Sequence, residues 1–195
     1  MERERAVEAC NAPGNRRAWA SVGWQGKGVV EIRRVRPDDG PLLRAGRIAA
    51  ITDTPIAFSV TLAETMGRTP QEWDTRVRTT SEGNTEGMFL AVEDGQPVGI
   101  MGAYFDTEDD CWVLISVWIH PDHRGGALAT ELHTVVTDWV RGTGATEIFL
   151  DVGQSNDRAQ AFYRGLGYVA TGKSQPHPWH PTEVELDMRL TLRDG

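Results

Sequence analysis

A loop of small residues between an apolar run and a helical pattern is the first place where this chain could do chemistry. The apolar run from Val113 to Ile119 ends at His120-Pro121, where proline removes a backbone donor and stops a strand. From residue 128 onward, apolar residues recur at helical spacing. The first N–H groups of a helix lack internal partners, and glycines let an anion come close to them. Arg124 adds a planar fork of donors, so the loop predicts a phosphate site.

Two other kinds of phosphate loop do not fit this sequence. The glycine-rich stretch 23–28 lacks the leading glycine, and the Ser or Thr after lysine, that a nucleoside-triphosphate loop needs. No G-x-G-x-x-G pattern follows an expected strand, which argues against a dinucleotide-binding fold.

The loop instead resembles the pyrophosphate loop of the GNAT superfamily of acetyl-CoA-dependent N-acetyltransferases. That family's pattern is Gln/Arg-x-x-Gly-x-Gly/Ala, and the matching residues are Arg124, Gly125, Gly126, Ala127, Leu128 and Ala129. Ala127 departs from the usual glycine, and its methyl group narrows the phosphate cradle, although alanine suits a helix start. A chance Gly-Gly turn before a helix is the alternative interpretation of this motif alone.

A second signature follows one helix and one strand later. Residues 146–152 alternate like a strand, and Ser155-Asn156 offers caps for another helix. The stretch from Asn156 to Tyr168 resembles the other GNAT signature, Asn-x-x-Ala-x-x-Phe/Leu-Tyr-x-x-x-Gly-Phe/Tyr. Both signatures occur in the family's order, and the resemblance covers roughly residues 28–190.

This resemblance implies acetyl transfer from acetyl-CoA to an amine, which has three chemical needs. The amine must lose a proton, since an alkylammonium has a pKa of about 10.4. The tetrahedral oxyanion needs a donor, and the departing thiolate needs a proton. By resemblance, the main chain of Val117, Trp118 and Ile119 holds the pantetheine arm like an added strand, whereas their side chains could serve core packing alone.

The resemblance also implies roles for two side chains of the second signature. Tyr163 matches the family's tyrosine that lies near the cofactor sulfur and protonates the leaving thiolate; the alternative is an aromatic residue that only packs on the sheet. Asn156 would hydrogen-bond the cofactor arm or cap the helix, and these two roles are compatible.

Asp151 is the candidate general base. It lies in Leu150-Asp151-Val152, twelve residues before Tyr163. The family branch that acetylates ribosomal-protein N-termini has a glutamate base at this position relative to its tyrosine. Aspartate is one methylene shorter, which leaves a water relay open, and a solvated strand-end carboxylate is the other interpretation.

The histidines do not predict a metal site. His120 and His123, and likewise His177 and His180, flank a Pro-containing pair without helical His-x-x-x-His spacing or partner cysteines. The segment 175–181 is expected to form the loop between the last two strands, which borders the acceptor cleft in this family. Trp179 in that loop either contacts substrate or anchors the loop.

The order of elements that positions these residues predicts an α/β domain. By resemblance it is a GNAT fold, a mixed, mostly antiparallel central sheet that splays after the fourth strand and is flanked by helices. Strands are expected at 29–36, 87–93, 97–105, 111–119, 146–152, 168–172 and 183–192. Helices are expected from 37 to about 50, in a broken region over 51–82, from 128 to about 141 and from 156 to about 166.

Composition, charge and hydropathy restrict the domain organisation, the cellular location and the partners that the sequence predicts. Residues 1–27 lack a sustained period and predict an N-terminal extension, with a single acetyltransferase domain over 28–195. The net charge of −8 argues against nucleic acid as a partner. No apolar run could span a bilayer and no export signal follows the charged N-terminus, so a cytoplasmic protein without a membrane partner is expected. A homodimer remains open.

The sequence therefore predicts an N-acetyltransferase that moves an acetyl group from acetyl-CoA directly to a primary amine in a ternary complex. The expected acceptor is a small molecule such as an amino sugar, a polyamine or an amine antibiotic. Two alternatives remain: acetylation of protein N-termini or lysines, and a non-catalytic acyl-CoA-binding sensor domain.

Overall fold

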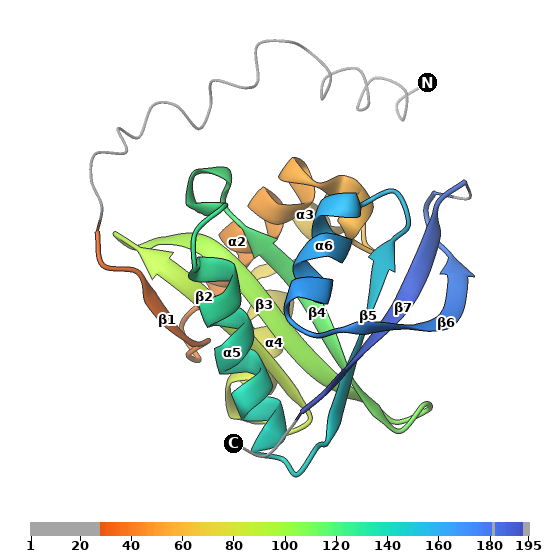
Figure 1. Ribbon diagram of the computed structural model, residues 1–195. Coiled ribbons are helices and arrows are strands. Elements are labelled where there is room, and N and C mark those ends of the chain that lie inside the picture. The colour runs from red at the N-terminus through yellow and green to blue at the C-terminus, as the bar shows by residue number, and fades with distance from the viewer. Residues whose placement is uncertain (1–27, 181, 193–195) are drawn as a thin grey trace, which may run out of the picture.

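The computed structural model describes residues 28–180 and 182–192, and in these a single seven-stranded sheet forms the centre of the protein (Figure 1). The strand order is β1-β2-β3-β4-β5-β7-β6, in which only β4 and β5 run parallel. The strands are β1 (Glu31–Arg34), β2 (Glu86–Glu93), β3 (Gln96–Asp106), β4 (Cys111–Ile119), β5 (Glu147–Gly153), β6 (Val169–Pro176) and β7 (Val184–Thr191). The expected mixed, mostly antiparallel sheet is thereby confirmed.

Helices cover both faces of the sheet (Figure 1). On one face lie α2 (Gly40–Asp53), the short 3-10 helix η2 (Pro55–Ala57), α3 (Leu62–Gly67) and α4 (Pro70–Glu82). The other face carries α5 (Leu128–Arg141) and α6 (Asp157–Gly165). The broken helical region expected over 51–82 is confirmed. It breaks because Thr61 and Thr69 each start a new helix with a capping box, to Glu64 and Glu72 respectively.

Two apolar clusters bury the two faces. The cluster beneath α5 and α6 includes Leu132, Val136 and Leu150, whereas the one beneath α2 and α4 includes Leu43, Val77 and Trp118. The central strands β2 and β3 are buried along almost their whole length because helices cover them on both sides. Each face of the sheet is therefore held to its helices by a separate buried apolar cluster.

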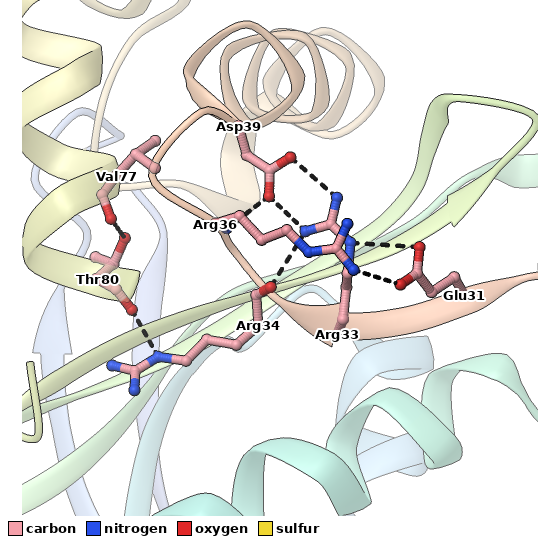
Figure 2. Close-up of polar contacts among 7 residues, drawn as sticks. All are labelled: Glu31, Arg33, Arg34, Arg36, Asp39, Val77 and Thr80. Atoms are coloured by element: carbon pink, nitrogen blue, oxygen red, sulfur yellow. Dashed lines mark hydrogen bonds and ion pairs between the residues drawn. The ribbon is translucent and has the colours of Figure 1, made fainter. Parts of the chain in front are cut away.

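Strand β1 is attached to the helices by arginines (Figure 2). The Arg33 guanidinium forms a two-point ion pair with Asp39, one bond of which is 2.9 Å long. Arg34 donates from Nε to the carbonyl of Thr80 at 2.8 Å and so joins β1 to α4. Asp39 also accepts from the Arg36 amide at 2.6 Å. This explains why the Asp39 side chain makes no capping bond to the helix that follows it.

Several expected boundaries are wrong by a few residues. The first strand begins at Glu31, because Val29 is 93% exposed and outside the sheet, and the first helix spans 40–53 instead of 37–50. Strand β6 extends to Pro176, so the last loop begins at His177 instead of Gln175. All of β6 is exposed and its sequence is polar, so no apolar alternation indicates how long it is. The extension expected over residues 1–27 lies outside the described residues.

Strands β4 and β5 diverge soon after they meet. Their parallel pairing joins Val113 to Phe149, and the described residues that follow in β4 have no further registered partner in β5. On the other side, β4 stays paired with β3 up to Ile119. The edge of β4 from Leu114 to Ile119 thus faces a gap in the sheet, as expected from a splay after the fourth strand.

Candidate active site

A cavity of about 350 Å³ lies where β4 and β5 separate. Its walls come from segments far apart in the chain: α2, the stretch 56–60, β3, β4, β5, α6 and the start of β7. At its centre, β4 carries a bulge, since Gly102 pairs with Ile115 but Ile100 pairs with Trp118. Ser116 in this bulge has a φ of 61°, a backbone conformation that non-glycine residues adopt at a cost of about 1–3 kcal/mol. The bulge changes the direction of the β4 main chain beside the cavity.

Tyr163 reaches this cavity from α6. The residue is 7% exposed and its ring packs beside Phe162 and Tyr168, with centroids 5.5 and 5.6 Å apart. Within the described part of the chain its hydroxyl has no hydrogen-bond partner, and the residue lines the cavity. Burial raises the pKa of the Tyr163 phenol well above its ordinary value, so it keeps its proton at neutral pH. Such a hydroxyl can donate to a group that enters the cavity.

Asp151 lies on the same cavity, on strand β5. Its neighbours Leu150 and Val152 point into the core beneath α5 and α6, so Asp151 faces the side of the sheet that α2 and α4 cover. The pKa of its carboxyl is raised to about 6, first by desolvation and then by the charges of Glu185 and Asp187. Gln175 donates to Asp151 at 3.2 Å. A carboxyl group with this pKa is ionised at neutral pH and can accept a proton.

The loop before α5 offers unsatisfied donors, as its sequence indicated. Among the described residues, the N–H groups of Gly125, Gly126 and Ala127 donate to no protein acceptor. Gly125 has a φ of 81°, which suits glycine, and a β-carbon built there would meet no atom within 4 Å. Ala127 is the N-cap of α5 and makes no side-chain cap bond. The loop therefore presents its main chain to open space, which fits the approach of a phosphate group.

Arg124 has protein partners that the sequence did not indicate. Its Nε donates to the carbonyl of Ile119 at 2.8 Å, and its Nη2 forms an ion pair with Asp53 at the end of α2. Trp118 donates from its indole nitrogen to the same carboxylate at 3.0 Å. Asp53 thus joins α2, β4 and the loop, and Arg124 retains further donors, because a guanidinium has five.

The three β4 residues expected at the pantetheine arm differ in what their side chains do. Trp118 is 4% exposed and packs beneath α2, whereas Ile119 is 7% exposed and belongs to the cluster beneath α5. Val117 lines the cavity. The side chains of these residues therefore contribute to packing, and the role expected for them at the pantetheine arm concerns their main chain along the open edge of β4.

Asn156 caps helix α6. Its Oδ1 accepts from the Ala159 amide at 3.1 Å, so the capping role is observed. In the part of the chain that the structure describes, its side-chain NH₂ group makes no hydrogen bond, and the residue lines the cavity. One end of the amide is committed to the helix and the other remains available to a ligand.

Arg47 is a cavity residue that sequence reasoning missed. It comes from α2, donates from Nη1 to Ser116 Oγ at 2.7 Å and lies over the Phe58 ring, 5.1 Å from its centroid. Burial lowers the pKa of Arg47 to about 10, with further lowering from the positive charges of Arg76 and Arg68. Nothing in the α2 sequence distinguishes Arg47 from Arg44, which is exposed on the same helix.

The last loop also contacts the cavity wall. Trp179 donates from its indole nitrogen to the carbonyl of Ser59, and Ser59 lines the cavity. Of its two expected roles, loop anchor is the one that the structure shows. Glu185, at the start of β7, lines the cavity too and shares Gln175 with Asp151 at 3.2 Å. Sequence reasoning missed Glu185, because its position at the cavity depends on the pairing of β5 with β7.

Two histidines, His133 and His123, have structural partners. His133 lies 4% exposed, and its Nε2 is 3.0 Å from the hydroxyl of Tyr168; burial lowers the pKa of this imidazole to about 4. His123 pairs with the buried Glu93 at 3.2 Å. Over residues 28–180 and 182–192, no three His, Cys, Asp or Glu side chains are grouped so that they could hold a metal ion. The helices in these ranges are all too short or too polar to cross a membrane.

Among curated proteins, similarity is found to a bacterial acetyltransferase. The chain is 29% identical over 142 residues to the mycothiol acetyltransferase of Streptomyces coelicolor, which covers 72% of this chain and 43% of that protein. The chain thus spans less than half the length of this relative. Two solved structures share the fold. A GNAT-family acetyltransferase from Streptococcus pneumoniae has a TM-score of 0.74 and 18% identity, and the match covers 85% of this chain and 100% of that one. The PaiA N-acetyltransferase of Thermoplasma acidophilum in complex with coenzyme A has a TM-score of 0.65 and 13% identity, with 84% of this chain and 99% of that one covered.

The sequence profile of the GNAT acetyltransferase family matches residues 55–168, well over half of the chain. The matched range runs from η2 to the residue before β6. It contains the diverging strands β4 and β5, the loop before α5, Asp151 and Tyr163. The resemblance drawn from the two signatures is confirmed, and this chain belongs to the GNAT acetyltransferase family.

Proposed function

We propose that this protein transfers the acetyl group of acetyl-CoA to a primary amine of a small molecule, with Asp151 as general base and Tyr163 as general acid. The observation that carries the proposal is that one cavity is lined by a carboxyl group with a pKa of about 6 and by a tyrosine hydroxyl that has no hydrogen-bond partner among the described residues. These are the two proton carriers that amine acetylation needs.

The residues around the gap fit acetyl-CoA. The unpartnered N–H groups of Gly125, Gly126 and Ala127, with the positive end of the α5 dipole behind them, suit the pyrophosphate. Leu128 and Ala129 add the next helical N–H groups, and Arg124 supplies further donors. The open edge of β4 at Val117, Trp118 and Ile119 and the amide of Asn156 suit the pantetheine arm. When bound there, acetyl-CoA supplies the activated acetyl thioester.

The protein's side chains then move two protons in the proposed reaction. Asp151 takes a proton from the acceptor ammonium, directly or through one water, which leaves the amine lone pair free to form the new N–C bond. The C–S bond breaks, and Tyr163 gives its phenolic proton to the departing thiolate. The second proton of the attacking nitrogen passes to the phenolate of Tyr163, directly or through water, and restores the phenol. The raised pKa of the Tyr163 phenol keeps its proton in place before the reaction, so Tyr163 enters this step as a proton donor.

The size of the cavity favours a small-molecule acceptor over a protein. Its volume of about 350 Å³ lies at the small end of the range for ligand pockets, about 300–1,000 Å³. The contact of Trp179 with Ser59 joins the last loop to the stretch 56–60 over the acceptor side.

A two-part experiment tests the proposed function. Calorimetry with acetyl-CoA measures binding, and release of the CoA thiol is then followed with a panel of small amines, a lysine peptide and a peptide with a free N-terminus. We expect tight binding and thiol release with at least one small amine. Release only with a peptide would favour protein acetylation. Binding without release for any acceptor would favour the sensor domain.

A further inference from the structure

The charged groups of the cavity have opposite signs on its two walls. Asp151 and Glu185 contribute carboxylates from β5 and β7, joined through Gln175. Arg47 contributes a guanidinium from α2, on the same side of the sheet as Asp151. A ligand that fills the cavity therefore meets negative charge from β5 and β7 and positive charge from α2.

Arg47 differs from Arg76, the other arginine that lines the cavity, in having no carboxylate partner among the described residues. Arg76, which also lines the cavity, pairs with Glu86 at 3.0 Å, and Arg124 pairs with Asp53. Arg47 instead contacts a neutral hydroxyl, Ser116 Oγ, and the face of the Phe58 ring. Its charged neighbours are other arginines.

This arrangement is costly unless a ligand completes it. The Arg47 side chain is partly buried, so its charge is partly removed from water, and charges removed from water in proteins are generally paired. Ser116 takes one donor of the Arg47 guanidinium, so others remain for a ligand in the cavity. A guanidinium binds the two oxygens of a carboxylate, phosphonate or phosphate through parallel hydrogen bonds.

We propose that the acceptor is a small zwitterion, whose anionic group binds Arg47 while its primary amine lies at Asp151. This inference rests on the proposed function and adds the substrate class to it. It favours amino acids and aminoalkyl phosphonates or phosphates over polyamines, because a second ammonium would lie against Arg47. Arg47 is then a binding residue that selects the acceptor, and the cavity's volume limits the acceptor to a few carbon atoms between its two charges.

Four matched acceptors test this selection: γ-aminobutyrate, its neutral amide, the diamine putrescine, and aminopropylphosphonate. They present a carboxylate, no charge, a second cation and a phosphonate at similar distances from the amine. Amino carboxylates from glycine to ε-aminocaproate are then compared to find the best chain length between the amine and the carboxylate. With the parent protein we expect kcat/KM for thiol release to be about 10- to 100-fold higher for the best anionic acceptor than for its neutral amide. Putrescine should be the poorest, and the ratio of carboxylate to phosphonate tells which anion is preferred.

Arg47→Met removes the charge and keeps much of the side-chain volume. We expect it to abolish the preference for the anionic acceptor by raising its KM, while kcat/KM for the neutral amide and the affinity for acetyl-CoA stay unchanged. Arg47→Lys keeps the charge without the planar fork and should retain part of the preference. Arg44→Met is the matched control, because it removes an exposed arginine from the same helix, and it should behave like the parent.

Folding of the Arg47→Met protein is checked by thermal unfolding. We expect its Tm to equal or exceed the parent's, since no carboxylate loses a partner. A preference of the parent for putrescine or the neutral amide would overturn the zwitterion proposal. An equal loss of kcat for all acceptors in Arg47→Met would overturn it too, because Arg47 would then act on the reacting acetyl group. If no acceptor releases thiol from bound acetyl-CoA, the proposed function itself fails.

Discussion

Asp151 and Asp187 stand directly opposite each other on the antiparallel strands β5 and β7, so two carboxylates lie on the same face of the sheet. Like charges at opposed positions destabilise a strand pair. Here Asp187, together with Glu185, raises the pKa of Asp151 to about 6, in addition to the larger effect of desolvation. The sheet register thus contributes to the proton affinity of the proposed base.

The pH dependence of the reaction should report this coupling. We expect kcat/KM to fall below a pH of about 6 as Asp151 becomes protonated. Asp187→Asn removes one of the charges that raise this pKa, so the acidic limb of the profile should move to lower pH with little change in its plateau. Asp151→Asn should lower the plateau at neutral pH and recover part of the rate in alkali, where free amine is abundant. A profile that is the same in all three proteins would assign the limb to another group.

The raised pKa of Asp151 also has a cost in folding free energy. Because the folded protein binds the proton more tightly than the unfolded chain, this group contributes stability below pH 3.8 and loses it as the pH rises through about 6. Asp151→Asn should therefore increase the Tm at pH 7, and the increase should disappear in acid. Thermal unfolding from pH 4 to pH 8 measures this difference. A lower Tm for the variant at pH 7 would mean that the Asp151 carboxylate stabilises the fold.

Tyr163 should act at the chemical step and not in binding. Tyr163→Phe keeps the packing against Phe162 and Tyr168 but removes the proton donor, so kcat should fall by about 10²–10⁴-fold while acetyl-CoA affinity stays nearly unchanged. Tyr168→Phe is the control: it removes a hydroxyl bonded to His133 and should cost about 0.5–1.5 kcal/mol of stability without affecting kcat. Full activity of Tyr163→Phe would show that water or another group protonates the thiolate.

The two roles of Asn156 can be separated by replacement. Asn156→Asp keeps the oxygen that accepts from Ala159 but loses the NH₂ donor, so the helix should stay capped while acetyl-CoA binds more weakly. Asn156→Ala loses both and should also destabilise the protein by about 0.5–2 kcal/mol. Calorimetry and thermal unfolding measure the two effects. Unchanged acetyl-CoA affinity in Asn156→Asp would leave capping as the role of this residue.

Arg124 should contribute to acetyl-CoA binding even though it is paired with Asp53. Arg124→Ala should weaken the affinity by one or two charge-assisted hydrogen bonds, about 1.5–3 kcal/mol each. Asp53→Asn weakens the competing ion pair and should increase the affinity, or leave it as it is. If Arg124→Ala binds acetyl-CoA as tightly as the parent, Arg124 serves only to join the loop to α2.

Sequence reasoning predicted what depends on local chain order. Short sequence patterns predicted the loop before α5, the cap at Asn156 and the positions of Asp151 and Tyr163. The structure brings Asp151, Asn156 and Tyr163 to one cavity. Arg47 could not be predicted, because its place in the cavity depends on how α2 packs over the bulge at Ser116. The partner of Arg124 was missed for a similar reason, since Asp53 is 71 residues away in the chain.

The central claim is that the cavity between β4 and β5 acetylates an amine nitrogen. Mass spectrometry of the acceptor after incubation with acetyl-CoA tests it most directly, with the CoA thiol measured in the same samples. We predict one acetyl group on the amine nitrogen for each CoA released by the parent protein, and a much slower appearance of both products with Tyr163→Phe. Release of CoA without acetylated amine would contradict this prediction. Acetylation of the amine at the parent's rate by the Tyr163→Phe variant and also by the Asp151→Asn variant would contradict it too.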